Sequence, residues 1–165
     1  MSTNALVKTD NASHHNELIQ LVSFGLDNEE YGVEVLKVRE IIRMTPITKM
    51  PNAPPYVEGV INLRGVVVPI ISMRKRFNLI ENDFDSHTRI MVMDVAGGLT
   101  GYIVDGVSEV IRIPSSDIQP APTIVSGNIG QDYITGVINH ADRMLILMDV
   151  DRMFSENELN SFAEM

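Results

Sequence analysis

The chain repeats part of its own sequence, and this repeat constrains the fold more than any other feature. Residues 32–43 (GVEVLKVREIIR) align with residues 101–112 (GYIVDGVSEVIR), and six of the twelve positions are identical. Residues 56–62 align with residues 133–139, and five of the seven positions are identical. Because chance gives about one match in twenty positions, the similarity indicates internal duplication. We therefore expect two similar folded units with a groove between them.

Composition excludes several classes of function. The 165 residues carry a net charge of −9, and an acidic surface disfavours nucleic acid and anionic membranes as partners. The absence of cysteine rules out disulfides, thiol catalysis and cysteine-ligated metal. No apolar run approaches the roughly 20 residues that a membrane-spanning helix needs. These features fit a cytoplasmic protein that meets other proteins through local patches.

Each half of the sequence predicts about five short strands. Runs of β-branched and aromatic residues bounded by turn residues predict the strands, and the glycines at 97 and 98 predict a hairpin turn. The fold class we expect is all-β, with two small five-stranded barrels related by the internal repeat. The predicted strands lie at 18–26, 31–35, 38–44, 57–63 and 66–73 in the first half, and at 89–95, 99–104, 107–112, 134–139 and 144–150 in the second half.

The predicted domain organisation follows from the repeat and from local composition. Residues 1–17 are polar and predict a disordered tail. Ser155 and Glu158 resemble the capping box that begins a helix. Along the chain we expect a tail at 1–17, one domain at 18–154 with a first barrel at 18–77, an acidic solvated linker at 78–87 and a second barrel at 88–150, and a short C-terminal helix at 155–165.

The sequence carries no recognisable catalytic motif. It has no phosphate-binding glycine loop, no zinc-protease helix motif and no nucleophile elbow, and its four histidines show no pair at metal-ligand spacing. Asp94, Asp105 and Asp149 could form a carboxylate cluster, but each borders a strand, where aspartate commonly makes turn hydrogen bonds. We therefore expect a binding protein without enzymatic activity and without a cofactor.

The two halves differ at the turn that follows their shared Val-Ile-Asn sequence. The first half has Arg64-Gly65 there and the second has Ala141-Asp142, so a turn at this position does not need arginine. Arg64 is therefore a candidate for partner binding, because its planar guanidinium binds carboxylates or amides through two hydrogen bonds. The alternative is an intramolecular ion pair with Glu40, and both can hold together. Glu40 itself is expected to pair locally with Arg43.

Several motifs resemble those of the CheW family of chemotaxis coupling proteins. Residues 62–70 (NLRGVVVPI) resemble the family's Asn-Leu-Arg-Gly-x-x-x-Pro-Val hallmark. The remaining similar segments are 31–41, 104–110 (VDGVSEV), 117–122 (DIQPAP) and 142–147 (DRMLIL). The resemblance covers residues 18–154 in order, with no motif missing.

This resemblance implies a fold and a set of partners. The fold would be two SH3-like barrels around a shared core. The function would be that of a cytoplasmic adaptor, recruited to membrane receptor arrays, that joins methyl-accepting chemotaxis receptor tips to the regulatory domain of the histidine kinase CheA. The resemblance places kinase contact at the barrel ends without identifying residues. It places receptor contact in the groove between the barrels, near Val38, Glu40, Gly59, Asn62, Arg64 and Gly65.

Two other functions remain open at this point. The chain could be an adaptor of a chemosensory pathway that does not control flagella, which nothing in the sequence separates from flagellar chemotaxis. It could also be a double barrel that binds a small molecule, which a defined apolar pocket with convergent polar groups would support.

Overall fold

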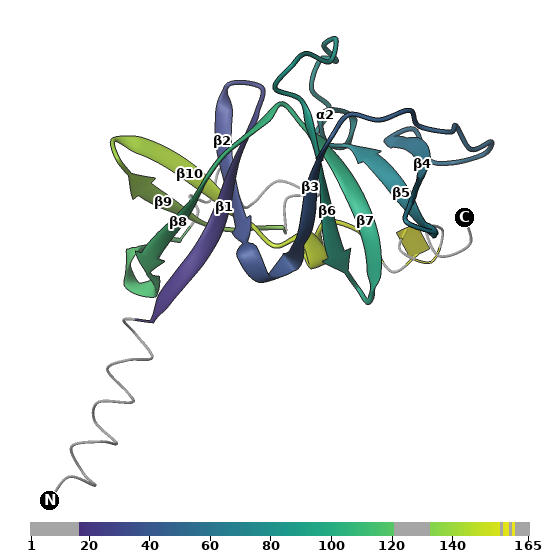
Figure 1. The fold of residues 1–165 in the computed structure, drawn as a ribbon. Helices are drawn as coiled ribbons and strands as arrows, with labels where there is room; N and C mark the ends of the chain where they lie inside the picture. Colours follow the sequence, from purple (N-terminus) through teal and green to yellow (C-terminus); the bar gives the residue numbers. More distant parts are fainter. Residues whose placement is uncertain (1–16, 121–132, 156, 159, 161–165) are drawn as a thin grey trace, which may run out of the picture.

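The structure is a computed structural model that describes residues 17–120, 133–155, 157, 158 and 160. The predicted tail lies outside these residues, except for Glu17, and so does most of the predicted C-terminal helix. The regular structure of the described chain is mostly β-strand, arranged as two five-stranded sheets that face each other (Figure 1). The all-β prediction is confirmed.

The first sheet has the strand order β8-β1-β2-β10-β9. Its hydrogen bonding is antiparallel except between β2 and β10, which are parallel. The strands are β1 (Leu18–Leu26), β2 (Glu29–Glu34), β8 (Gly106–Pro114), β9 (Ile134–His140) and β10 (Arg143–Met148).

The second sheet has the order β3-β6-β7-β5-β4 and repeats this pattern, with β5 and β7 as its parallel pair. Its strands are β3 (Val38–Arg43), β4 (Val57–Leu63), β5 (Val66–Ser72), β6 (Arg89–Val95) and β7 (Gly98–Val104). The short helices are η1 (Val35–Lys37), α2 (Met73–Arg76), η2 (Ser115–Asp117) and η3 (Val150–Arg152).

Each sheet takes strands from both halves of the sequence. The hairpin β1–β2 lies between β8 and β10 of the second half, and the hairpin β6–β7 lies between β3 and β5 of the first half. The predicted barrel boundaries, 18–77 and 88–150, are therefore wrong, although the repeat itself is confirmed. The physical reason is that η1 carries the chain from β2 in one sheet to β3 in the other, so each hairpin completes the barrel of the other half.

Matching bridges close the two barrels. Thr48 pairs with Val60 through two backbone hydrogen bonds of 2.9 and 2.8 Å, and Gln119 pairs with Val137 in the same way at 2.9 and 2.8 Å. Gly59, which lies beside the first bridge, has a φ of +149°, and a Cβ there would lie 2.1 Å from the Thr48 carbonyl oxygen. The duplicated glycine is thus required by barrel closure, because no side chain fits so close to the backbone.

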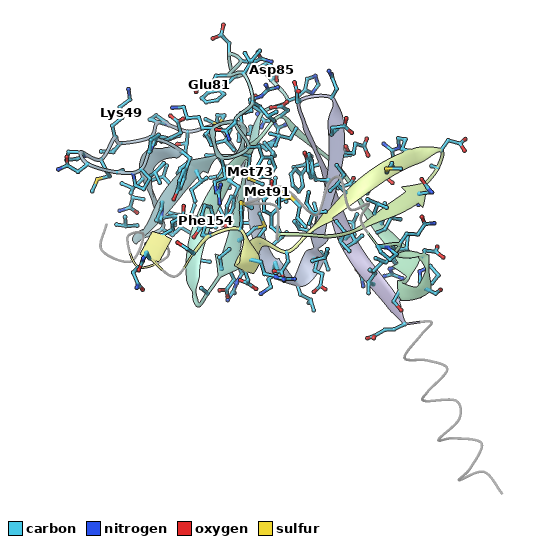
Figure 2. All side chains as sticks on the ribbon, turned by 180° about the vertical axis from the view of Figure 1, so that it is seen from behind. Lys49, Met73, Glu81, Asp85, Met91 and Phe154 are labelled. Atoms are coloured by element: carbon cyan, nitrogen blue, oxygen red, sulfur yellow. The ribbon has the colours of Figure 1, made fainter. Side chains whose placement is uncertain are left out.

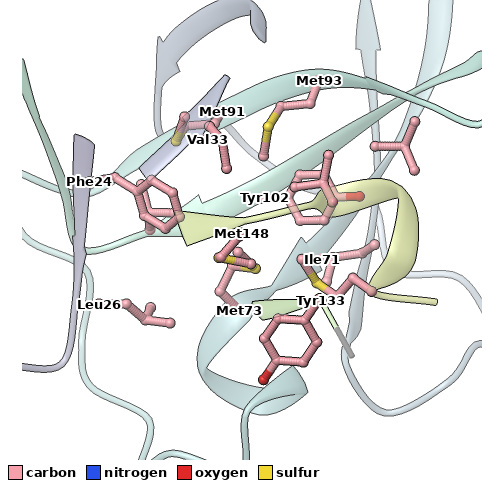
Figure 3. Packing of buried hydrophobic residues seen from close by; sticks show 14 of the residues in the cluster. Phe24, Leu26, Val33, Ile71, Met73, Met91, Met93, Tyr102, Tyr133 and Met148 are labelled. Carbon is pink, nitrogen blue, oxygen red and sulfur yellow. The ribbon is translucent and has the colours of Figure 1, made fainter. Parts of the chain in front are cut away.

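The largest hydrophobic cluster lies between the two sheets and combines residues of both (Figure 3). Phe24 and Val33 of the first sheet meet Met91 and Tyr102 of the second within it. Figure 2 shows Met73 and Met91 inside the body, whereas Glu81 and Asp85 lie on the exposed connection between α2 and β6. Each barrel provides the second cover for the other's strands, as their continuous apolar sequences predict.

The expected capping box at the C-terminus is confirmed. The Glu158 N–H donates to the Ser155 hydroxyl oxygen at 3.2 Å, and the Ser155 N–H donates to a Glu158 carboxylate oxygen at 2.9 Å. This reciprocal pattern satisfies backbone donors at the start of a helix. The same Glu158 carboxylate accepts a hydrogen bond from the Tyr56 hydroxyl, which ties the end of the chain to the first half.

Candidate functional site

Arg64 and Gly65 form the two-residue turn between β4 and β5. Both have positive φ angles, 50° and 88°, as expected for the hairpin turn that matches strand twist. The Gly65 N–H donates to the Asn62 side-chain oxygen at 2.8 Å, which fixes the turn from within. The turn therefore holds Arg64 at the tip of the hairpin, where 70% of its side chain is exposed.

The Arg64 guanidinium makes a two-pronged ion pair with Glu40 of β3. Nη1 donates to Oε2 at 3.2 Å, and Nη2 donates to Oε1. The hydrogen bonds from Arg64 lower the pKa of the Glu40 carboxyl below its usual range. Exposed pairs of this kind contribute little to stability, because water screens both charges. The pair orients Arg64 while leaving most of its side chain open to a partner.

The structure brings together four of the six residues predicted to line a receptor groove. Glu40, Asn62, Arg64 and Gly65 meet at this turn. The other two lie elsewhere. Val38 is half-buried at the start of β3, where it packs against the central hydrophobic cluster. Gly59 is buried near the opposite end of β4, and its role there is barrel closure.

The second half builds the matching turn from other residues. Ala141 and Asp142 also have positive φ angles, 51° and 63°. Glu109, the repeat counterpart of Glu40, lies 3.9 Å from Nη2 of Arg143 and 3.8 Å from Nε2 of His140. The repeat therefore keeps a carboxylate with a cation nearby, but the arginine follows the turn instead of standing in it.

Sequence alignment of the turns missed this exchange, because Arg143 aligns with Val66 and not with Arg64. Arg143, which directly follows the turn, was the sequence feature that could have predicted a cation near Glu109. The predicted local pair between Glu40 and Arg43 is absent from the described part of the chain, where Arg64 takes this carboxylate instead.

The three aspartates considered for catalysis each have a structural partner. Asp94 pairs with Arg39 at 3.1 Å, and Asp105 pairs with Arg74 through two hydrogen bonds of 2.9 and 2.5 Å. Asp149 caps η3 by accepting the N–H of Asp151 at 3.0 Å. Within the described ranges, no three histidine, aspartate or glutamate side chains gather closely enough to hold a metal ion.

The described residues also include no helix of sufficient length and hydropathy to span a membrane.

Comparison with known proteins identifies the family. A model of the CheW-like domain matches residues 20–158. The chemotaxis protein CheW of Treponema pallidum is 36% identical over 155 residues, covering 92% of this chain and 91% of the relative. The chemotaxis protein CheW of Klebsiella aerogenes is 38% identical over 140 residues, covering 85% of this chain and 84% of the relative.

A solved structure agrees with these sequence relatives. The crystal structure of the scaffolding protein TtCheW from Thermoanaerobacter tengcongensis superposes with a TM-score of 0.77 at 33% identity, covering 85% of this chain and 94% of that one. The match to the family model extends over both barrels, because residues 20–158 run from β1 past η3. The chain belongs to the CheW family.

Proposed function

We propose that this protein is a non-enzymatic adaptor of bacterial chemotaxis that joins the cytoplasmic tips of methyl-accepting receptors to the regulatory domain of the histidine kinase CheA. The observation that carries the proposal is the CheW-like match over residues 20–158, on a chain whose candidate catalytic carboxylates are taken up by structural contacts. Its relatives bear the names of chemotaxis and scaffolding proteins. It acts in the cytoplasm at receptor arrays.

We place receptor contact around the turn Arg64-Gly65. The exposed guanidinium already binds one carboxylate in two-pronged geometry, which leaves its outer edge for a polar group of the partner. The apolar residue that follows the turn, Val66, is exposed as well, at 48%. A charged anchor bordered by apolar surface is the composition that protein interfaces favour.

We place kinase contact on apolar residues that the repeat presents twice. Ile41 and Val67 are 39% and 54% exposed, and their repeat counterparts Val110 and Met144 are 57% and 56% exposed. A partner with the same double-barrel fold would meet such patches head to tail. Contacts of this type form rings or open filaments according to the rotation between partners, and both can be joined into extended arrays. Signalling then passes as a change in relative geometry, since the adaptor supplies no chemistry of its own.

Co-sedimentation with receptor-containing membranes tests this function. The purified chain should pellet with the membranes, and the purified kinase should pellet only when the chain is also present. Membranes that lack receptors are the control. If the kinase pellets equally without the chain, or if the chain stays in the supernatant, the proposed coupling function is wrong.

A further inference from the structure

A cavity of about 330 Å³ opens at the edge of the barrel that the first sheet forms (β8-β1-β2-β10-β9), next to η1 and η3. Its apolar walls come from three strands, from η3 and from the segment after η2, and they include Ile19, Val33, Ile118 and Leu147. Charged side chains stand among them. This volume lies within the range of sites that hold a small ligand or one large side chain.

The repeat places a second cavity at the equivalent position of the other barrel. This one measures only about 70 Å³. Five of its lining residues are repeat counterparts of residues lining the first cavity: Glu58 for Thr135, Ser72 for Asp149, Arg74 for Asp151, Thr88 for Ile19 and Ile103 for Glu34. The two cavities are thus versions of one feature of the fold.

The smaller cavity is covered by the chain itself. Residues 81–84 of the connection between α2 and β6 line it, and they include Phe84, which remains 56% exposed. Cations of α2 hold this acidic segment in place. Arg74 donates to the Ile80 carbonyl oxygen at 2.5 Å, and the Lys75 ammonium lies 3.5 Å from the Glu81 carboxylate. An acidic segment carrying an aromatic residue therefore closes a mouth at which Arg74 is paired with Asp105 and Lys75 with Glu58.

The open cavity carries an excess of negative charge. Glu34, Asp149 and Asp151 line it together with a single cation, Lys37. The Lys37 ammonium donates a hydrogen bond to the Asp151 carboxylate and forms an ion pair with it, so it compensates that negative charge. Asp149 accepts one backbone N–H, and Glu34 has no ion pair among the residues that the structure describes. Two carboxylates at the mouth are left without a compensating charge.

We propose that this cavity binds a peptide segment of a partner protein in which one large apolar or aromatic side chain is flanked by lysine or arginine. The apolar side chain enters between the apolar walls, and the flanking cations pair with Glu34 and Asp149. The segment takes the place that residues 81–84 take in the other barrel. The inference does not depend on the proposed coupling function.

The protein's own N-terminal segment is the competing occupant, since it precedes β1 as the connection precedes β6. Counted back by the repeat offset, residues 12–15 match residues 81–84. They read Ala-Ser-His-His and supply neither a large apolar side chain nor a lysine or arginine. A partner in trans therefore satisfies the cavity better.

Two synthetic peptides test the proposal against the full chain. One copies residues 80–87 (IENDFDSH), and the other carries lysine in place of its three acidic residues. In an NMR titration the lysine peptide should shift resonances of Ile19, Thr135 and Leu147, and it should bind about ten-fold more tightly than the acidic peptide. The preference should weaken as salt rises, because the contacts at the mouth are partly exposed.

Matched variants locate the binding. The double variant Glu34→Gln, Asp149→Asn should weaken lysine-peptide binding about ten-fold, whereas Glu29→Gln, Asp142→Asn, with the same change of charge at exposed positions elsewhere, should not. Thr135→Trp should abolish binding by filling the mouth. Equal binding of both peptides, no binding, or resonance shifts outside the cavity would overturn the proposal. Binding that appears only after deletion of residues 1–16 would also overturn it, by assigning the cavity to the chain's own terminus.

Discussion

The turn Arg64-Gly65 and the turn Ala141-Asp142 have the same backbone and different surroundings. All four residues have positive φ angles, so neither turn depends on its particular side chains for its shape. In the first half the arginine stands in the turn and reaches Glu40 with two hydrogen bonds. In the second half the arginine follows the turn. The fold therefore requires the backbone conformation of the turn but does not require an arginine within it. The position of the exposed arginine can vary, and so it can be selected for binding a partner.

A second contrast concerns the signs of the charges in one ion pair of each barrel. Arg74 pairs with Asp105 in one barrel, and Asp151, the repeat counterpart of Arg74, pairs with Lys37 in the other. The fold thus keeps an ion pair at both barrel edges but exchanges its signs. Arg74 accordingly lines the smaller cavity, whereas Asp151 lines the larger one at the equivalent position.

The largest expected loss of stability comes from replacing the glycine that both halves share at the bridge closing each barrel. Gly59→Ala should destabilise the protein by about 3 kcal/mol or more, because the new Cβ would overlap the Thr48 carbonyl oxygen. Gly136→Ala should also destabilise it, since a Cβ there would lie 2.7 Å from Ile118. Urea unfolding measures both. Gly65→Ala is the control and should cost about 1 kcal/mol, because nothing lies within 4 Å of its Cβ position. Equal losses at all three glycines would contradict this account of barrel closure.

The next largest loss of stability is expected from breaking the ion pair of Arg74 with Asp105, compared with that of Lys37 with Asp151. Arg74→Gln should cost about 2 kcal/mol, because the Arg74 side chain is only 12% exposed and holds two partners. Lys37→Gln should cost about 0.5 kcal/mol, because both members of that pair are more than a third exposed. Unfolding free energies decide the order. A larger loss for Lys37→Gln would show that exposure does not govern these pairs.

A smaller effect appears at alkaline pH, where Tyr31 of the first hairpin contributes together with Tyr56, Tyr102 and Tyr133, whose pKa values burial also raises. Burial raises the pKa of Tyr31 from 10.0 to about 12, and the second hairpin has Thr100 at the matching position. The unfolded state then loses this proton before the folded state does. Stability is full below pH 10 and should fall as the pH rises toward 12. Tyr31→Phe should reduce this fall, as followed by thermal melting between pH 9 and 12, and an unchanged fall would contradict the assignment.

The sequence predicted the positions of the strands closely, but it predicted wrongly which strands belong to the same barrel. The predicted strands 18–26, 57–63 and 89–95 coincide with β1, β4 and β6, because periodicity and turn residues are local signals. Which strands pair depends on contacts far apart in sequence. Two contiguous barrels and two barrels with exchanged hairpins use the same strands, so the repeat alone could not separate them.

The candidate site was predicted in part for a similar reason. The contrast between the two turns led to Arg64, and its pairing with Glu40 followed from complementary charge. Gly59 joined the predicted groove only through motif resemblance, whereas its location shows a requirement of the backbone. The open cavity had no sequence signal, since its lining comes from segments scattered between Ile19 and Asp151.

Receptor binding by Arg64→Glu, measured by co-sedimentation with receptor membranes, tests the central claim most directly. Ala141→Glu, which places the same residue in the matching turn, is the control. We predict that Arg64→Glu lowers receptor binding at least about ten-fold, that Ala141→Glu leaves it unchanged, and that both melt close to the parent protein, because the altered side chains are exposed. Equal binding by the two variants, or a melting temperature that collapses together with binding in Arg64→Glu, would contradict the claim that this arginine serves the partner and not the fold.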